Sequence, residues 1–263
     1  MRLMTVIALC LALLPGAARA DWDPGDPYEW LQLPDPNGWD VHDDLVVLLA
    51  DDFAASENRW ITGIHFWGSW KSDDVGAIEK ISVGIHANVP ADQDPARPFA
   101  HPGEMLWYRS IDAATYGGVV VRPWGVGEQG WYDAVTGEYS PAEHTETWQV
   151  NVFLNPSDWF LQSGSADAPT VYWLALGVYP STYEDFGWKT SSSHWSAPAA
   201  QGMWFGPSQP NPPQWWKDLG TPPFTREGLD MAFVLTGAPV PEPGTHLLLG
   251  AGLLALLAWR RRT

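Results

Sequence analysis

The chain has 263 residues, with 31 Asp and Glu against 14 Lys and Arg, and a formal net charge of −17. This acidic balance excludes an electrostatic nucleic-acid binder, because phosphates would be repelled. The 25 Gly and 24 Pro residues, with only 17% charged residues, indicate a folded domain with many loops.

The first twenty residues have the features of a secretory signal peptide. Arg2 precedes the apolar run 4–14, and residues 18–20 (Ala-Arg-Ala) form a small-x-small cleavage site. The alternative, an uncleaved anchor helix, is disfavoured because the apolar run is too short to span a bilayer. We expect signal peptidase to cut after Ala20. Cys10 is the only cysteine, so the mature chain would have no disulfide.

Residues 21–238 are predicted to form one all-β domain. Four segments combine β-branched and aromatic residues, mostly with the period of two typical of strands: 61–67, 81–86, 148–154 and 171–178. Weaker strand predictions are 45–49, 105–111, 119–122, 202–205 and 231–235. Crossover helices are not predicted, which disfavours a parallel α/β fold. We therefore expect an antiparallel β-sandwich or jelly roll.

A series of motifs between residues 41 and 110 resembles an uncharacterised family of secreted bacterial domains. The motifs are ADDF at 50–53, ITGIHFWGSWK at 61–71, IHANVPA at 85–91 and HPGE at 101–104. The resemblance implies export and supports the fold expectation. The family has no established activity, so the resemblance assigns no catalytic residue.

Tryptophan is unusually frequent, with 18 residues in the chain. Indole rings stack on sugar rings, and aromatic rows on β-sandwiches commonly bind glycans. Our candidates are Trp67, Trp70 and Trp107. Trp67 and Trp70 lie three residues apart, so they point to opposite faces of a strand and at least one is expected to face outward. Core filling is the alternative for each ring. Further candidates, without ranking, are Trp124, Trp131, Trp195 and Trp204.

Pairs of aspartates are the candidate metal ligands. Calcium prefers several carboxylate and carbonyl oxygens, and Asp51 with Asp52, or Asp73 with Asp74, are predicted to hold a structural calcium ion. The alternative is that these residues form turns and a solvated surface. No other cofactor is predicted.

Two further patterns have ordinary explanations. The tripeptide Gly-Ile-His occurs at 63–65 and 84–86, so His65 and His86 would lie side by side if the two strands pair. Residues 125–130 match G-x-G-x-x-G, but no helix is predicted to follow, and nucleotide binding is not expected. No hydrolase motif is found, although a glycosidase needs only two carboxylates.

The last residues combine three features in a fixed order. A Pro-Glu-Pro motif is followed by the apolar run 247–259 and by three arginines. This order resembles the PEP-CTERM sorting tail, here 239–263. The resemblance implies transient membrane anchoring through the apolar helix, then cleavage near the motif by an exosortase. The arginines should remain cytoplasmic, which places residues 21–238 outside. The residues concerned are Pro241, Glu242, Pro243, Arg260, Arg261 and Arg262.

These patterns together predict a non-catalytic protein of the cell surface or the exopolysaccharide matrix. Glycan binding is the leading molecular hypothesis. The alternatives are a polysaccharide hydrolase or lyase on a jelly-roll scaffold and a purely structural matrix protein.

Overall fold

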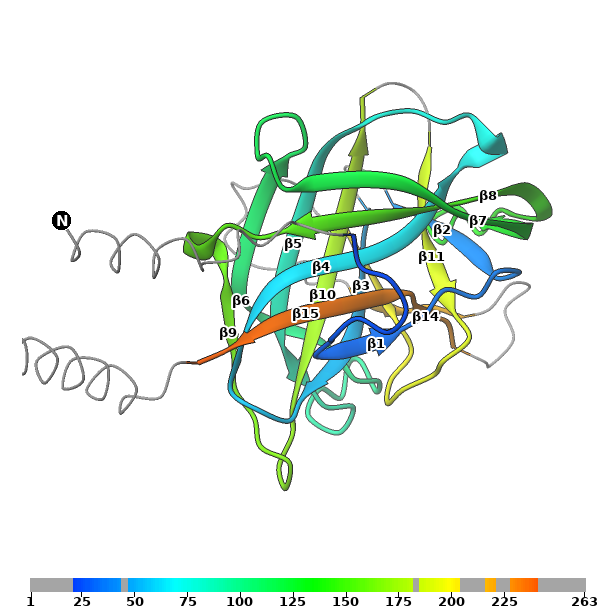
Figure 1. Ribbon diagram of the computed structural model, residues 1–263. Coiled ribbons are helices and arrows are strands. Elements are labelled where there is room, and N and C mark those ends of the chain that lie inside the picture. The colour runs from blue at the N-terminus through cyan, green and yellow to red at the C-terminus, as the bar shows by residue number, and fades with distance from the viewer. Residues whose placement is uncertain (1–20, 44–46, 182–184, 204–215, 221–227, 241–263) are drawn as a thin grey trace, which may run out of the picture.

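The computed structural model describes residues 21–43, 47–181, 185–203, 216–220 and 228–240, which form two sheets in a sandwich-like arrangement (Figure 1). No helix within these ranges is long and apolar enough to span a membrane. The predicted signal peptide with Ala20, the candidate Trp204 and residues 241–263 of the sorting tail lie outside them.

The larger sheet has nine strands in the order β1-β15-β4-β8-β7-β2-β11-β14, with β9 paired to β4. Its strands are β1 (Trp30–Gln32), β2 (Trp39–His42), β4 (Arg59–Trp70), β7 (Val119–Tyr132), β8 (Tyr139–Phe153), β9 (Phe160–Gln162), β11 (Phe186–Ser191), β14 (Asp230–Met231) and β15 (Phe233–Pro239).

The smaller sheet has six strands in the order β13-β12-β3-β10-β5-β6. Its strands are β3 (Val47–Ala55), β5 (Ile78–Val89), β6 (His101–Asp112), β10 (Thr170–Pro180), β12 (Ala200–Met203) and β13 (Lys217–Asp218). Two 3-10 turns, η1 (Lys71–Asp73) and η2 (Pro156–Asp158), follow β4 and β8. Among the paired strands described, only β2 and β7 run parallel.

Five strands of the larger sheet close into a ring. β15 pairs with β4 as far as Phe66, and β11 then pairs with the last residues of β4, from Gly68 to Trp70. Because β11 also pairs with β2, the pairings run β4, β8, β7, β2, β11 and back to β4. Gly68 permits this closure, since a Cβ atom there would lie 2.3 Å from the Gly187 carbonyl oxygen.

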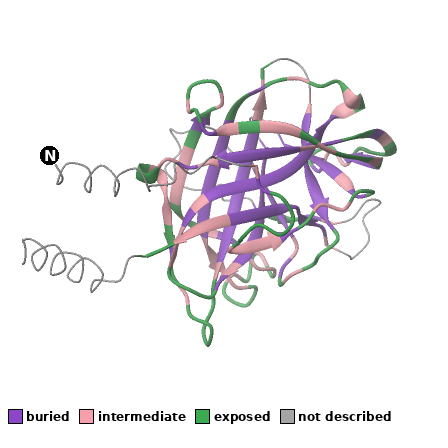
Figure 2. Ribbon diagram, in the orientation of Figure 1, coloured by how far each residue is buried: buried purple, intermediate pink, exposed green. Residues whose placement is uncertain are grey.

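The main core lies between the sheets, where alternate residues of each strand point inward. β3 contributes Leu49 and Phe53, and β4 contributes Ile64 and Phe66. Smaller apolar clusters around Trp173 and Trp67 cover the outer faces of the two sheets. The central strands are accordingly buried along most of their length (Figure 2).

Each of the nine predicted strand segments overlaps a strand of the structure, with residues 45, 46, 204 and 205 outside the described ranges, and the all-β prediction is confirmed. The G-x-G-x-x-G segment lies within β7, so no helix follows it. His65 and His86 do not lie side by side, because the strand pairing on which that arrangement depended does not occur. β4 and β5 belong to different sheets, and each histidine has its own partners, Asn151 for His65 and the Gly103 carbonyl for His86.

Candidate functional site

Three buried carboxyl groups gather where the segment 194–198 crosses β3. β12 pairs with β3 only as far as Ala50, and Asp51 and Asp52 follow on β3. Asp230 comes from β14. All three side chains are buried, with at most 2% of each residue exposed. We call Asp51, Asp52 and Asp230 the acidic cluster.

Main-chain and amide N–H groups hold the acidic cluster in place. Asp51 Oδ2 accepts hydrogen bonds from the Met231 amide at 2.7 Å and from Gln32 Nε2 at 3.1 Å. Asp52 Oδ2 accepts one from the Ala197 amide at 3.2 Å. Asp230 Oδ2 accepts one from the Trp195 amide at 2.7 Å. The acidic cluster therefore fixes the backbone of 195–197 against β3 and β14.

Burial dominates the electrostatics of the acidic cluster, because it disfavours the charged form of a carboxyl group. Burial raises the pKa of Asp52 to about 7. Burial, with the nearby charges of Asp230 and Asp52, raises the pKa of Asp51 well above its ordinary value. The pKa of Asp230 is also raised by burial, against the opposing effects of the Trp195 amide and His194. The acidic cluster therefore retains protons that exposed aspartates would lose.

A pocket of about 660 Å³ adjoins the acidic cluster. Trp195, half-buried, lines it together with Asp230 and with His194, whose Nδ1 lies 3.6 Å from Asp230 Oδ2. The Trp195 ring is held by an edge contact with Trp30, at a centroid distance of 4.9 Å. The remaining described lining comes from Ser196, Ala197, Pro198 and Gly228. A flat aromatic surface beside a carboxyl group and an imidazole can bind a polar ring-shaped ligand.

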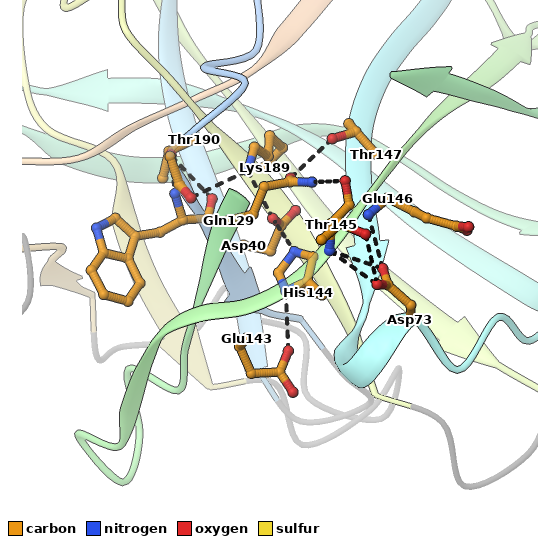
Figure 3. A network of polar contacts seen from close by, with 12 residues as sticks. Asp40, Asp73, Gln129, Glu143, His144, Thr145, Glu146, Thr147, Lys189 and Thr190 are labelled. Carbon is orange, nitrogen blue, oxygen red and sulfur yellow. Dashed lines mark hydrogen bonds and ion pairs between the residues drawn. The ribbon is translucent and has the colours of Figure 1, made fainter. Parts of the chain in front are cut away.

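A second buried polar network lies inside the ring of strands (Figure 3). Asp40 Oδ2, on β2, is 3.0 Å from Lys189 Nζ on β11 and 2.8 Å from His144 Nε2 on β8. β2 and β8 are not neighbours in the sheet, so this contact crosses the ring. Gln129 Nε2 on β7 donates to the Thr145 carbonyl, and Thr147 Oγ1 donates to Gln129 Oε1.

The predicted sugar-binding tryptophans are mostly covered. Trp67 is 0% exposed and Trp70 is 2% exposed, because Trp22 and Trp124 cover the first and Trp148 and Phe186 contact the second. The two side chains point to opposite faces as predicted, but neither presents a ring to solvent, so the expectation that one faces outward is wrong.

Trp107 is half-buried, yet its ring already has partners. Its indole N–H donates to the Asp158 carbonyl at 3.0 Å, and the Arg109 guanidinium lies over the ring at 5.1 Å. None of the tryptophans in the described ranges is exposed. Of the further candidates within the described ranges, Trp124, Trp131 and Trp195, it is Trp195 that lines the pocket beside the acidic cluster.

The two predicted calcium pairs lie apart and in different settings. Asp51 and Asp52 are buried within β3, whereas Asp73 is in η1 and accepts hydrogen bonds from the Thr145 and Glu146 amides. Asp74 follows as an exposed residue. Within the described ranges, no three Asp, Glu, His or Cys side chains are arranged to hold a metal ion.

Sequence reasoning missed Asp230, Asp40, His144 and Lys189. Asp230 reaches Asp51 and Asp52 from about 180 positions away along the chain, as the Met231 hydrogen bond shows. Lys189 contacts Asp40 across 149 positions. Lys189 lies between Trp188 and Thr190 in the sequence, a pattern that gives no indication of its burial.

Comparison with known proteins gives two matches. Residues 28–236 match a family described as a domain of unknown function, DUF7901. Residues 239–262 match the PEP-CTERM protein-sorting motif. No curated protein and no solved structure matches the chain.

Proposed function

The chain belongs to the DUF7901 family and ends in a PEP-CTERM sorting motif, and we propose that it is a non-catalytic glycan-binding protein of the cell surface or exopolysaccharide matrix. The sorting motif makes it an exported protein, membrane-anchored before exosortase cleavage. Signal peptidase would remove residues 1–20 before that step.

The observation that supports glycan binding is the pocket beside Trp195. Apolar C–H groups of a sugar ring stack on an indole, while its hydroxyl groups donate to carboxyl oxygens. Trp195 and Asp230 supply these two features in one pocket of about 660 Å³. The edge contact with Trp30 holds the indole in place before the ligand arrives, which lowers the entropy cost of binding.

Charge narrows the class of glycan. The chain carries a formal net charge of −17, which gives the whole molecule a negative electrostatic potential. Anionic sugars such as uronic acids would be repelled. The expected ligand is therefore an uncharged polysaccharide.

The test is retention of the exported protein on insoluble, uncharged polysaccharides. Trp195→Ala is expected to weaken retention about tenfold, corresponding to roughly 1.4 kcal/mol. Trp124→Ala is the matched control, because Trp124 is also half-buried and also makes one edge contact with a tryptophan, at 5.2 Å from Trp67. Equal retention of both variants would contradict the assignment of the pocket.

One specific observation favours polysaccharide hydrolysis or lysis as a second candidate function. Asp230 lines the pocket, and burial raises its pKa; a carboxyl group of raised pKa is the usual general acid of glycoside-cleaving enzymes. New sugar ends that appear with the wild-type protein and disappear with Asp230→Asn would establish this function in place of simple binding.

A further inference from the structure

The network inside the ring of strands places an amine against a carboxyl group, and neither Lys189 nor Asp40 is among the described residues that line the proposed glycan pocket. Lys189 and Asp40 are direct partners in the register of β11 and β2. Lys189 Nζ lies 3.0 Å from Asp40 Oδ2 and 3.3 Å from the Gly38 carbonyl oxygen. Both side chains are 0% exposed.

A third group contacts the same carboxyl oxygen. His144 Nε2 lies 2.8 Å from Asp40 Oδ2, and its Nδ1 lies 3.1 Å from Glu143 Oε2 (Figure 3). Burial alone would lower the pKa of His144, but the hydrogen bond and charge of Asp40, with the hydrogen bond to Glu143, raise it. The imidazole is therefore held as a proton donor to Asp40 Oδ2.

Lys189 and Asp40 are both buried away from water. Burying an ion pair carries a large desolvation cost, which the mutual attraction offsets only when every polar atom is bonded. Asp40 Oδ1 has no hydrogen-bond partner among the described residues. Proton transfer from Lys189 to Asp40 would leave a neutral amine beside a carboxylic acid, and an amide would remove the charges permanently.

We propose that Lys189 and Asp40 condense into an intramolecular isopeptide bond that links β11 to β2. The Lys189 ammonium first gives a proton to Asp40 Oδ2. The neutral Nζ then attacks Cγ, forming the C–N bond. His144 Nε2 protonates Oδ2, which leaves as water when the C–O bond breaks. The surplus proton on Nζ returns to His144, and Oδ1 becomes the amide oxygen.

Such a bond would stabilise the folded domain as a disulfide does in other exported domains. Cys10 is the only cysteine in the chain, so no disulfide can form within it. The linked residues lie 149 positions apart, and cross-links that close long loops restrict the unfolded chain most strongly. The bond would lock the ring of strands at β2 and β11.

Mass spectrometry of the exported, denatured chain tests the proposal directly. We expect the wild-type chain to be lighter than its sequence by one water molecule and to give a branched peptide joining Lys189 to Asp40, with no tryptic cleavage after Lys189. Lys189→Arg should restore the full mass. His144→Gln should slow formation of the branched peptide.

Lys71→Arg is the matched control, because Lys71 also pairs with an aspartate, at 3.8 Å from Asp185, but on the surface. It should keep the loss of one water. A wild-type chain with full mass and ordinary tryptic cleavage at Lys189 would overturn the proposal, and this measurement does not depend on whether any variant folds.

Discussion

At the scale of single residues, the acidic cluster is the least ordinary feature of this molecule. Three carboxyl groups are buried together, and burial raises the pKa of each. Between pH 4 and pH 7 the folded chain therefore keeps protons that the unfolded chain has lost. Stability falls with rising pH wherever the folded state binds more protons than the unfolded state.

The acidic cluster predicts that the free energy of unfolding decreases as pH rises from about 4 to about 7, where Asp52 titrates. Burial lowers the pKa of His65 to about 4. At pH values between that pKa and the ordinary pKa of histidine, His65 therefore makes the free energy of unfolding increase with rising pH, which is the opposite trend. The measurement is therefore a difference: wild type against Asp52→Asn, by urea denaturation at several pH values.

Asp52→Asn removes the Asp52 contribution, which is on the order of a few kcal/mol. The free energy of unfolding of the variant should rise relative to that of the wild type as pH rises, because its amide cannot ionise beside Asp51 and Asp230. His194 is the nearby group whose charge opposes the rise in the pKa of Asp230. Parallel pH profiles for the two proteins would show that Asp52 titrates normally.

At the scale of elements, closure of the ring depends on the contact between β4 and β11. A Cβ atom at Gly68 would lie 2.3 Å from both the Gly187 carbonyl oxygen and the Phe186 ring. Gly68→Ala should therefore destabilise the fold by about 1–3 kcal/mol, the usual cost of overpacking. The melting temperature of the variant measures this.

Gly125→Ala provides the control for this element. Gly125 lies in β7 of the same ring, and no atom lies within 4 Å of a Cβ placed there. This change should leave the melting temperature nearly unchanged or raise it slightly. If Gly68→Ala also left the melting temperature unchanged, β4 and β11 would not pack as tightly as their pairing indicates.

Strands were predictable because their apolar residues alternate, as in 61–67 of β4. Which distant strands pair with one another could not be predicted from the sequence. The Gly-Ile-His repeat left open whether β4 and β5 pair, and the two strands lie in different sheets. The sequence predicted a calcium site at Asp51 and Asp52, with a turn as the alternative. Both residues lie within β3, where they accept hydrogen bonds from the Met231 and Ala197 amides.

At the scale of the whole molecule, β15 ends at Pro239 and the sorting motif begins at residue 239. The last described strand therefore reaches the first residue of the matched motif. Cleavage near Pro241-Glu242-Pro243 would separate the domain from the three arginines. Epitope tags on the two sides of this motif should separate in the native host, which immunoblotting detects. Tags that stay on one polypeptide would contradict processing.

The most direct test of the central proposal uses the exported protein with a panel of soluble and insoluble polysaccharides. It scores two quantities in each sample: protein depleted from solution and new sugar ends released. A glycan-binding protein predicts depletion by an uncharged polysaccharide without release. Release of sugar ends would identify an enzyme. If no polysaccharide of the panel depletes the protein and none releases sugar ends, the result contradicts glycan binding. A structural matrix protein is then the remaining interpretation.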